Sequence, residues 1–310
     1  MLASGLGLAL AAALALVACA DDPQAPPIDP DDIDGDGVPN AQDLCPGVRD
    51  PVQHDEDADG VGDLCDVCPT VADPLQSDTG ELDAISFNDG VGDACDPRPI
   101  AGGDHIGALH TFATDTTPAW IGAGWTIAGD RVRATAAATT ATAARWLHMR
   151  PAAGDSIAAR LAVESIAWAG GGAAAPGPAV AIALDGDGTE NARVCGVFAD
   201  RDGDGNDELE ARELGGATAV QALPGAAAGP FTLIAQRGVD RRRGTGLVHC
   251  HLVLPDRPDA PITASIPTSD DATTGQYAIA ATEVDVVATS LVVYASPYAC
   301  PTLALACDRP

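Results

Sequence analysis

The chain contains no lysine, so all 16 basic residues are arginines, set against 45 acidic residues for a formal net charge of −29. Such a charge repels nucleic-acid phosphates, which argues against a nucleic-acid-binding protein. Aromatic residues make up only 4% of the 310 residues, so any core must consist mainly of Val, Leu, Ile and Ala. The sequence also lacks a phosphate-binding loop, a nucleophile elbow and a plausible catalytic triad. The acidic excess instead suits an extracellular protein that binds divalent cations.

The N-terminal apolar run LASGLGLALAAALALVACA is too short and too poorly flanked for a membrane span, and it is typical of a secretory signal peptide. It ends in LVAC, Leu16 to Cys19, which resembles the lipobox of bacterial lipoproteins. The resemblance implies a signal peptide over residues 1–18, acylation of Cys19 and a membrane anchor made of lipid. Ala20 favours the outer membrane of a Gram-negative envelope, with the chain periplasmic or surface-exposed. A plain signal peptide cut near Ala20 is the alternative.

Nine cysteines are present. If Cys19 carries lipid, an even number remains, and an even set in an exported chain indicates disulfides. The remaining cysteines are Cys45, Cys65, Cys68, Cys95, Cys195, Cys250, Cys300 and Cys307.

Residues 20–100 hold 22 of the 45 acidic residues and only two arginines. Their sparse apolar residues follow neither a helical nor a strand period, which is the composition of a disordered segment. The regularity of the segment indicates otherwise. DIDGDGVPNAQDLCP (32–46) and DEDADGVGDLCDVCP (55–69) both begin D-x-D-x-D-G-V. We therefore expect two copies of one loop, with residues 19–31 as a linker before them.

Counted from its first Asp, each loop has acidic residues at positions 1, 3 and 5, glycine at 6, Asn or Asp at 9 and Asp at 12. An EF-hand loop surrounds Ca²⁺ at nearly this spacing, with a backbone carbonyl at position 7. Prolines and cysteines replace the flanking helices of an EF-hand. Without a cation, carboxylates about 5 Å apart repel one another, so metal binding would supply the folding free energy. The alternative is a solvated acidic linker. The expected ligands are Asp32, Asp34, Asp36, Val38, Asn40 and Asp43, then Asp55, Asp57, Asp59, Val61, Asp63 and Asp66.

A third, partial copy is NDGVGDACD (88–96), which matches ADGVGDLCD (58–66). Asp78 follows Gln76 as Asp55 follows Gln53, which implies a seven-residue insertion before Asp89. The cysteine spacings of twenty and twenty-seven residues agree with that insertion and predict the pairs Cys45–Cys65 and Cys68–Cys95. The insert offers two further carboxylates that could replace missing ligands. The expected ligands are Asp78, Asp89, Asp93 and Asp96, with Glu81 and Asp83 from the insert.

These residues resemble thrombospondin type 3 repeats, which run D-x-D-x-D-G…D-x-C-P…D-x-D-x-D-G-x-G-D-x-C-D. The resemblance extends over residues 32–98, about a fifth of the chain, and matches acid, glycine and cysteine positions together. It implies a Ca²⁺-loaded, disulfide-stapled segment with almost no apolar core, usually a spacer rather than a catalyst.

Residues 104–296 contain short segments of Val, Ile, Leu, Ala and Thr between Gly, Pro and Asp turns, and no long run combines a helical period with caps. This pattern predicts an all-β fold, a jelly-roll-like antiparallel β-sandwich after the calcium-stabilised repeats. DGDG (185–188), RDGDG (201–205) and RGVDRRRGTG (237–246) are expected at hairpin turns. The predicted strands are 131–137, 145–150, 156–166, 178–184, 192–199, 231–237, 246–254, 262–266, 277–281 and 288–294.

WTIAGDRVRA and GQYAIAATEVDVVATSLVVY loosely resemble segments of concanavalin-like, laminin-G-type sandwiches, a group of glycan binders, glycosidases and spacers. Cys195 and Cys250 fall in the middle of predicted strands and are expected to pair, either across the sandwich or between neighbouring strands. Cys300 and Cys307 are expected to close a tail over residues 297–310.

DRDGDGNDELEA (200–211) repeats the calcium-loop spacing with Asp200, Asp202 and Asp204, but position 12 is an alanine. Glu208 or Glu210 could close a Ca²⁺ site there, or the loop could be a solvated hairpin tip.

ELEARE (208–213) resembles the E-[IL]-D-x-x-E signature of laminarinase-type glycosidases, which need two carboxylates on one strand face. An arginine intrudes at 212 and aromatic platforms are sparse, so a charged strand edge is the preferred interpretation. HCH (249–251) places His249 and His251 on one strand face. Because zinc would need two more ligands, a strand whose Cys250 faces a disulfide partner is preferred.

The sequence therefore predicts an exported, lipid-anchored, calcium-binding protein of the cell surface that is not an enzyme. Its repeats would act as a spacer that presents the sandwich for adhesion or for binding glycan or protein. The alternatives are an extracellular polysaccharide hydrolase and a purely structural envelope protein. No nucleic-acid partner is expected, and the membrane is contacted through lipid alone.

Overall fold

The structure is a computed structural model, and it describes residues 29–79, 89–97, 103–112, 125–135, 145–148, 156–169, 179–184, 192–240, 245–268 and 277–296. Several predicted features lie outside these residues: the signal peptide, the lipidation site Cys19, Glu81, Asp83, the DGDG turn and the Cys300–Cys307 tail. No helix in the described part of the chain has the length and apolar character needed to cross a membrane.

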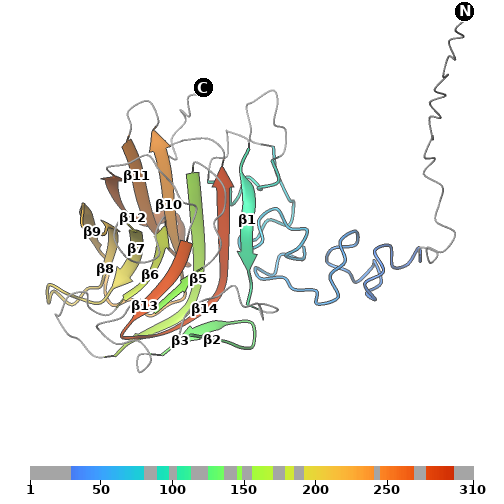
Figure 1. Cartoon of the computed structure of the whole chain (residues 1–310). Coiled ribbons are helices and arrows are strands. Elements are labelled where there is room, and N and C mark those ends of the chain that lie inside the picture. The colour runs from blue at the N-terminus through green and yellow to red at the C-terminus, as the bar shows by residue number, and fades with distance from the viewer. Residues whose placement is uncertain are drawn as a thin grey trace, which may run out of the picture.

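Every regular element in these residues is a strand, as Figure 1 shows, which confirms the predicted all-β class. The strands are β1 (His105–His110), β2 (Trp125–Ile127), β3 (Val132–Ala134), β4 (Arg145–His148), β5 (Ser156–Trp168), β6 (Ala179–Leu184), β7 (Arg193–Phe198), β8 (Glu208–Glu213), β9 (Thr218–Ala222), β10 (Phe231–Asp240), β11 (Thr245–Leu254), β12 (Arg257–Thr268), β13 (Tyr277–Thr282) and β14 (Val284–Ser296).

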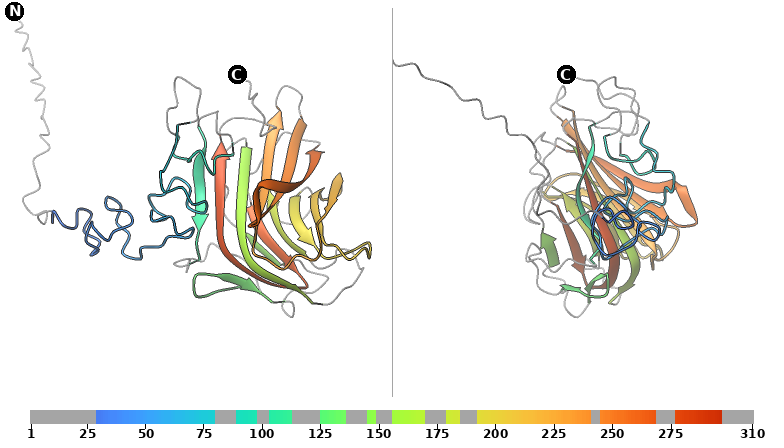
Figure 2. Two further views of the ribbon diagram at one scale, coloured as in Figure 1. Left: turned by 180° about the vertical axis from the view of Figure 1, so that it is seen from behind. Right: turned by 90° about the vertical axis from the view of Figure 1, so that its right-hand side faces the viewer.

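The strands form two antiparallel sheets packed face to face (Figures 1 and 2). The eight-stranded sheet has the order β12-β11-β10-β5-β14-β3-β2, with β1 paired to β14. The six-stranded sheet has the order β4-β13-β6-β7-β8-β9. The predicted antiparallel β-sandwich is therefore confirmed.

Side-chain alternation along the strands builds the core between the sheets. Leu233 and Leu252 of the eight-stranded sheet and Ile182 and Leu209 of the six-stranded sheet belong to one buried aliphatic cluster. The disulfide Cys195–Cys250 connects β7 with β11 and thus joins the two sheets, so of the two expected arrangements the structure shows the one across the sandwich. The core is mainly aliphatic because the sequence has few aromatic residues.

All ten predicted strands are present, and the flanking strands of the three expected hairpins are paired with each other. Four strands were missed: β1, β2, β8 and β9. β2 has only three residues, β8 is rich in glutamate, and β9 is an edge strand whose residues are mostly exposed. Because these strands have a weak hydrophobic signal of their own, their order depends on pairing with neighbouring strands.

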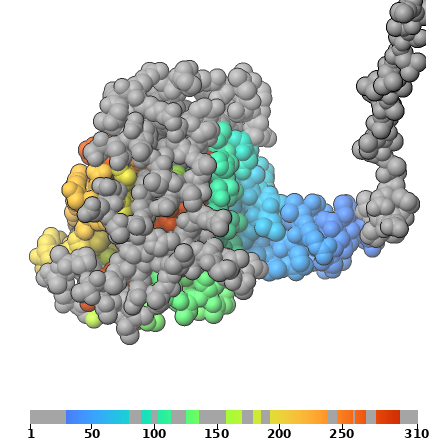
Figure 3. Space-filling model, viewed as in Figure 1, coloured from blue at the N-terminus to red at the C-terminus, as the bar shows by residue number. Residues whose placement is uncertain are grey.

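The described residues of the repeat segment, 29–79 and 89–97, form turns and bends without any strand ladder. Two disulfides staple the segment, Cys45–Cys65 and Cys68–Cys95, which are the pairs expected from the repeat alignment. Figure 3 shows the segment projecting from the side of the sandwich. Its last part packs Val91 and Cys95 against Val292 and Tyr294 on the outer face of the eight-stranded sheet.

Candidate metal sites

The three D-x-D-x-D-G loops and the interrupted third repeat share one local geometry. The glycine at position 6 has a positive φ in each, for example +96° at Gly60, which other residues rarely adopt. Its amide donates to the carboxylate at position 1 over 2.9–3.1 Å. The position-1 and position-6 pairs are Asp32 and Gly37, Asp55 and Gly60, Asp78 and Gly90, and Asp200 and Gly205.

The carboxylate at position 5 orients the peptide at position 7, because its Oδ1 accepts that residue's amide. In the first two repeats the residues at position 7 are Val38 and Val61, which were expected to offer their carbonyls to a cation. The carboxylate at position 3 accepts the amide at position 5, as Asp57 does from Asp59 over 3.1 Å. In the first two repeats these hydrogen bonds hold positions 1, 3 and 5 around one centre.

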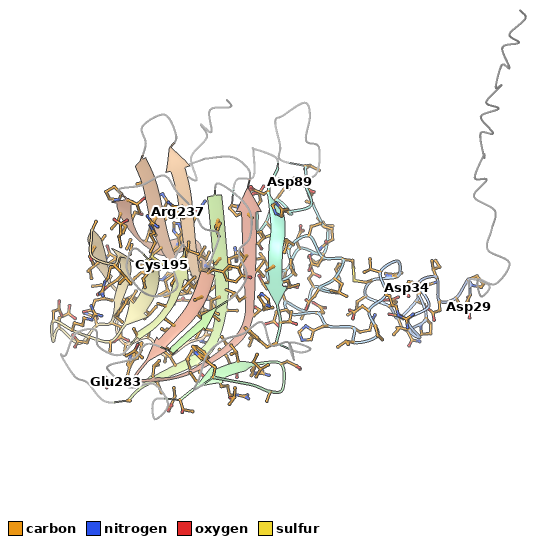
Figure 4. The ribbon with its side chains drawn as sticks, viewed as in Figure 1. Asp29, Asp34, Asp89, Cys195, Arg237 and Glu283 are labelled. Carbon is orange, nitrogen blue, oxygen red and sulfur yellow. A yellow bond between two sulfur atoms is a disulfide. The ribbon has the colours of Figure 1, made fainter. Side chains whose placement is uncertain are left out.

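Three groups of repeat carboxylates converge so that one oxygen from each lies within 4.8 Å of the others. The groups are Asp32, Asp34 and Asp36; Asp55, Asp57 and Asp59; and Asp89, Asp96 and Asp104. Figure 4 shows Asp34 in the distal part of the repeats and Asp89 next to the sandwich. The first two groups consist of expected ligands, whereas the third includes Asp104, which the sequence did not single out.

Several carboxylate oxygens in these loops are buried and accept no hydrogen bond among the residues that the structure describes. A buried carboxylate oxygen is normally paired, because its loss of hydration is costly. A cation bound by these oxygens would remove that cost, so the residues present fit a hard divalent ion. The oxygens are Asp34 Oδ2, Asp43 Oδ2, Asp55 Oδ1, Asp57 Oδ2 and Asp78 Oδ1.

Charge crowding is strongest at the second loop. Burial raises the pKa of Asp57 from 3.8 to about 7, and the carboxylates of Asp59, Asp66 and Asp55 add to the rise. Burial also raises the pKa of Asp34, with help from Asp36, Asp43 and Asp32. Asp66 raises the pKa of Asp57, and Asp43 raises the pKa of Asp34. The residue at position 12 therefore lies close to the converging carboxylates, as the spacing predicted.

A recurring glutamine fixes the residue at position 12. Asp43 Oδ1 accepts from the Cys45 amide and from Gln53 Nε2, both at 2.8 Å. Asp66 makes the same two bonds with Cys68 and Gln76. The signal was present in the sequence as DPVQ (50–53) and DPLQ (73–76), but the positioning role of the glutamine follows only from the structure.

The residues at position 9 hold the entry of each loop in place through hydrogen bonds. Asp63 Oδ1 accepts from the Glu56 amide, and Asp63 Oδ2 lies 2.6 Å from His54 Nδ1. Asn40 accepts from the Ile33 amide, and Asp93 accepts from Thr79. Asn40, Asp63 and Asp93 therefore hold the entry of each loop in place, and the ligand role expected from the spacing stays a prediction.

Position 5 also links each repeat to the segment that follows it. Asp36 Oδ2 accepts the Asp50 amide over 2.9 Å, and Asp59 Oδ2 accepts the Asp73 amide over 2.7 Å. In the third repeat Asp89 Oδ2 accepts the Asp104 amide over 2.7 Å.

Asp50 has a buried Oδ2 without a hydrogen-bond partner in the described residues, and the Asp104 carboxylate joins Asp89 and Asp96. Asp50 and Asp104 are thus candidate ligands that the loop spacing does not contain. Asp104 directly precedes β1, so the third group connects the repeats with the sandwich.

The loop between β7 and β8 brings Asp200 and Asp202 together with Glu208, not with Asp204. Glu208 is 6% exposed, and its Oε2 is buried and without a hydrogen-bond partner in the described chain. Burial raises its pKa, with a contribution from Asp202 and Asp200. Of the two expected closing residues, Glu208 lies at the site.

The ELEARE strand does not pair its outer glutamates. The register of β8 with β7 is continuous, so Glu208 and Glu213 lie on opposite faces of the strand. Glu210 forms ion pairs with Arg201, at 2.6 Å, and with Arg212. A two-carboxylate arrangement of the glycosidase kind is therefore not formed by Glu208 and Glu213.

The HCH segment is a strand whose cysteine faces a disulfide partner, which is the preferred interpretation of its sequence. Cys250 points inward to Cys195, whereas His249 and His251 lie outward and bond to Ser265 and Thr263. The carboxylate groups above are the metal-ligand groups found in the described residues, and no histidine belongs to them.

Comparison with known families agrees with the repeat geometry. Residues 30–53 and 47–76 match the model of the thrombospondin type 3 repeat. The resemblance to type 3 repeats is confirmed. The third loop lies beyond these two matches, so its assignment rests on the alignment and on the geometry it shares with the other two. Among curated proteins, none matches the chain.

Several solved structures align with 62–63% of the chain at low identity. The CBM2 module of Lactobacillus casei BL23 phage J-1 evolved Dit has a TM-score of 0.37 at 7% identity, over 63% of this chain and 97% of that one. Peanut lectin has a TM-score of 0.41 at 7% identity, over 62% and 97%. An endo-1,3-beta-glucanase from Streptomyces sioyaensis has a TM-score of 0.39 at 13% identity, over 63% and 98%. Similarities of this size do not extend to ligand or activity.

Proposed function

We propose that this chain is an exported protein whose type 3 repeats bind Ca²⁺ and form a spacer for a ligand-binding β-sandwich. One observation carries the proposal: the first and the second repeat each hold a buried carboxylate oxygen that accepts no hydrogen bond among the described residues, at a point where several carboxylates converge. Carboxylate and carbonyl oxygens are the ligands that Ca²⁺ prefers. A bound Ca²⁺ would neutralise the crowded charges and let the loops keep their order.

The chain's own residues prepare each site. The position-6 glycine holds the position-1 carboxylate, and the glutamine of the D-P-x-Q segment holds the position-12 carboxylate. In Asp55 the glycine bond uses Oδ2 and leaves Oδ1 for the cation, and in Asp43 the glutamine bond uses Oδ1 and leaves Oδ2. In the third repeat, Asp104 would extend the ligand set to the first residue before β1. Calcium there would fasten the spacer to the sandwich.

Export is supported by the disulfides and the repeats, both of which are features of extracellular proteins. A lipid anchor on Cys19 is part of the proposal because LVAC ends the apolar N-terminal run. Intact mass of the membrane fraction tests it: an acylated chain that begins at Cys19 is expected, and an unmodified chain that begins later would contradict the anchor.

The sandwich is proposed to bind a ligand rather than to catalyse a reaction, because Glu210 is tied to two arginines and Glu213 faces away from Glu208. Turnover of extracellular polysaccharides by the purified chain tests this point. Hydrolysis that is lost in Glu208→Gln would establish the alternative, an extracellular polysaccharide hydrolase.

A calcium titration with metal counting on the mature protein tests the calcium role. We expect binding at each repeat, together with slower hydrogen exchange over residues 50–70 in Ca²⁺ than in chelator. Equal exchange rates in Ca²⁺ and in chelator would show that the acidic segment is a solvated linker.

A further inference from the structure

A pocket of about 590 Å³ lies where the third repeat meets the outer face of the eight-stranded sheet. One wall is the repeat segment around Cys95 and Pro97, which the Cys68–Cys95 disulfide holds in place. The floor consists of outward-facing side chains of β5, β10, β11, β12 and β14. The volume falls within the range of roughly 300–1,000 Å³ that is typical of small-molecule sites.

Strand register sets the chemistry of the floor. Arg160 of β5 is directly opposite Ile234 of β10, which is opposite His251 of β11, and His251 is opposite Thr263 of β12. Neighbouring strands are about 4.8 Å apart, so Arg160 and His251 stand about 10 Å apart with the apolar Ile234 between them. The row therefore offers a cation at one side and an imidazole at the other. The distance between them is about the width of a sugar ring with its substituents.

Arg160 has no carboxylate partner among the described residues. Its Nε–H is buried and donates no hydrogen bond to the described residues, and burial lowers the pKa of the guanidinium. Asp96, the acidic residue of the described lining, belongs to the converging group with Asp89 and Asp104. A guanidinium taken out of water without a counter-ion is costly, and its planar donors match a carboxylate in two parallel hydrogen bonds.

His251 supplies a second unused polar atom. Its Nδ1 lies 2.9 Å from Thr263 Oγ1, which fixes the ring. Its Nε2 is buried and has no hydrogen-bond partner in the described chain. Because burial, with a contribution from His249, lowers the pKa of His251 to about 4, the ring is neutral and suits a hydroxyl group. Ile234, Val253 and two prolines add apolar surface for the C–H face of a ligand.

We propose that this pocket binds a sugar-sized hydroxylated carboxylate, such as a uronic acid, with the carboxylate on Arg160 and a hydroxyl on His251. The proposal deepens the ligand-binding role of the sandwich given above and rests on that role. It explains why a strongly acidic chain keeps, in the lining of a pocket, an arginine whose buried Nε has no hydrogen-bond partner among the described residues. The ligand would touch both the sheet and the third repeat, so the spacer would form part of the binding site.

Calorimetric titration of the full mature chain in saturating Ca²⁺ tests the proposal, with D-galacturonate as the probe and D-galactose as its neutral match. We expect saturable binding of galacturonate and at least tenfold weaker binding of galactose. Arg160→Met, which keeps the volume and removes the charge, should weaken galacturonate binding at least tenfold. Arg133→Met, a change of an arginine on β3, is the matched control and should leave binding unchanged.

Three results would overturn the proposal: no binding of galacturonate by the wild-type chain, equal affinity for galactose, or unchanged affinity in Arg160→Met. Acetate that binds as tightly as galacturonate would overturn the sugar part, because the hydroxyl contact to His251 would then contribute nothing. Arg160→Lys, which retains the charge but not the planar fork, should bind with intermediate affinity, so the test does not depend on one variant. Calcium counting on the same samples separates a failure of this proposal from a failure of the calcium role.

Discussion

Replacing Asp57 by asparagine should stabilise the calcium-free repeats and destabilise the calcium-loaded repeats. Asp57 Oδ1 accepts the Asp59 amide over 3.1 Å, and Oδ2 is buried without a hydrogen-bond partner among the described residues. Asparagine keeps an acceptor oxygen for the Asp59 amide. It removes a negative charge. Without calcium that charge is repelled by the other carboxylates, and with calcium it is attracted to the cation.

The magnitude follows from the pKa of Asp57, which rises from 3.8 to about 7. Taken at about 1.4 kcal/mol per pKa unit, this rise corresponds to roughly 4 kcal/mol of unfavourable free energy for the charged form. Asp57 is only partly buried, so solvent screening reduces the expected gain to about 1–2 kcal/mol at pH 8. With calcium, loss of a charged ligand should weaken binding at that site by roughly 10- to 100-fold or more.

The pH dependence has a definite sign. Because the folded-state pKa of Asp57 is raised, the calcium-free folded state binds more protons than the unfolded state between about pH 4 and pH 7. The calcium-free repeats should therefore gain stability as the pH falls through that window, whereas calcium affinity should fall as protons compete. Asp57→Asn should flatten both trends.

Hydrogen exchange over residues 50–70, in chelator and in saturating Ca²⁺, measures both states of wild type and variant. Asp256→Asn, an exposed residue of the turn between β11 and β12, is the charge-matched control and should change neither state. Destabilisation of Asp57→Asn by the same amount in chelator and in Ca²⁺ would refute the reasoning, because it would show a structural role that is independent of the cation.

Three further substitutions separate the repeats from the sandwich. Asp59→Ala removes a candidate ligand and also the acceptor of the Asp73 amide, so hydrogen exchange should accelerate over residues 50–79 while the sandwich keeps its protection; protected residues 71–79 would contradict this link. Gly62→Ala would place a Cβ 2.8 Å from Cys45 Sγ, and a fall in the unfolding midpoint of the repeats without loss of calcium stoichiometry is expected. Gly196→Ala would place a Cβ 2.6 Å from another Cβ in the six-stranded sheet. It should lower the free energy of unfolding of the sandwich by about 1–3 kcal/mol in a denaturant titration. The calcium titration should be unchanged, because the repeats do not contain this residue.

Local spacing allowed much of this protein to be predicted from its sequence. The D-x-D-x-D-G loops, the positive φ at Gly60 and the cysteine pairs of the repeats depend on residues within one loop or on the alignment of two loops. The ten predicted strands depend on alternation and on the turns between them. Strands such as β9, which has mostly exposed residues, were missed because they carry little alternation of their own.

Ligands and contacts that come from outside the local pattern were decided by the tertiary structure. Asp104 joins Asp89 because the chain returns to the third loop as it enters β1. Glu208, rather than Glu210, lies beside Asp200 and Asp202 because β8 begins there and turns that side chain toward them. Spacing alone could not distinguish these outcomes, since the direction of the chain beyond each loop is set by pairing with distant strands.

The pocket is the clearest example of tertiary control. Arg160 and His251 are separated by many residues in the sequence, and each is one polar residue in an alternating strand. Strand register brings them to opposite sides of Ile234, and the packing of the third repeat over β14 adds the wall beside them. The sequence by itself determined that acidic loops and β-strands would form, because those depend on spacing and alternation. Only the folded chain determined which side chains meet, because register and domain packing join residues that no local pattern connects.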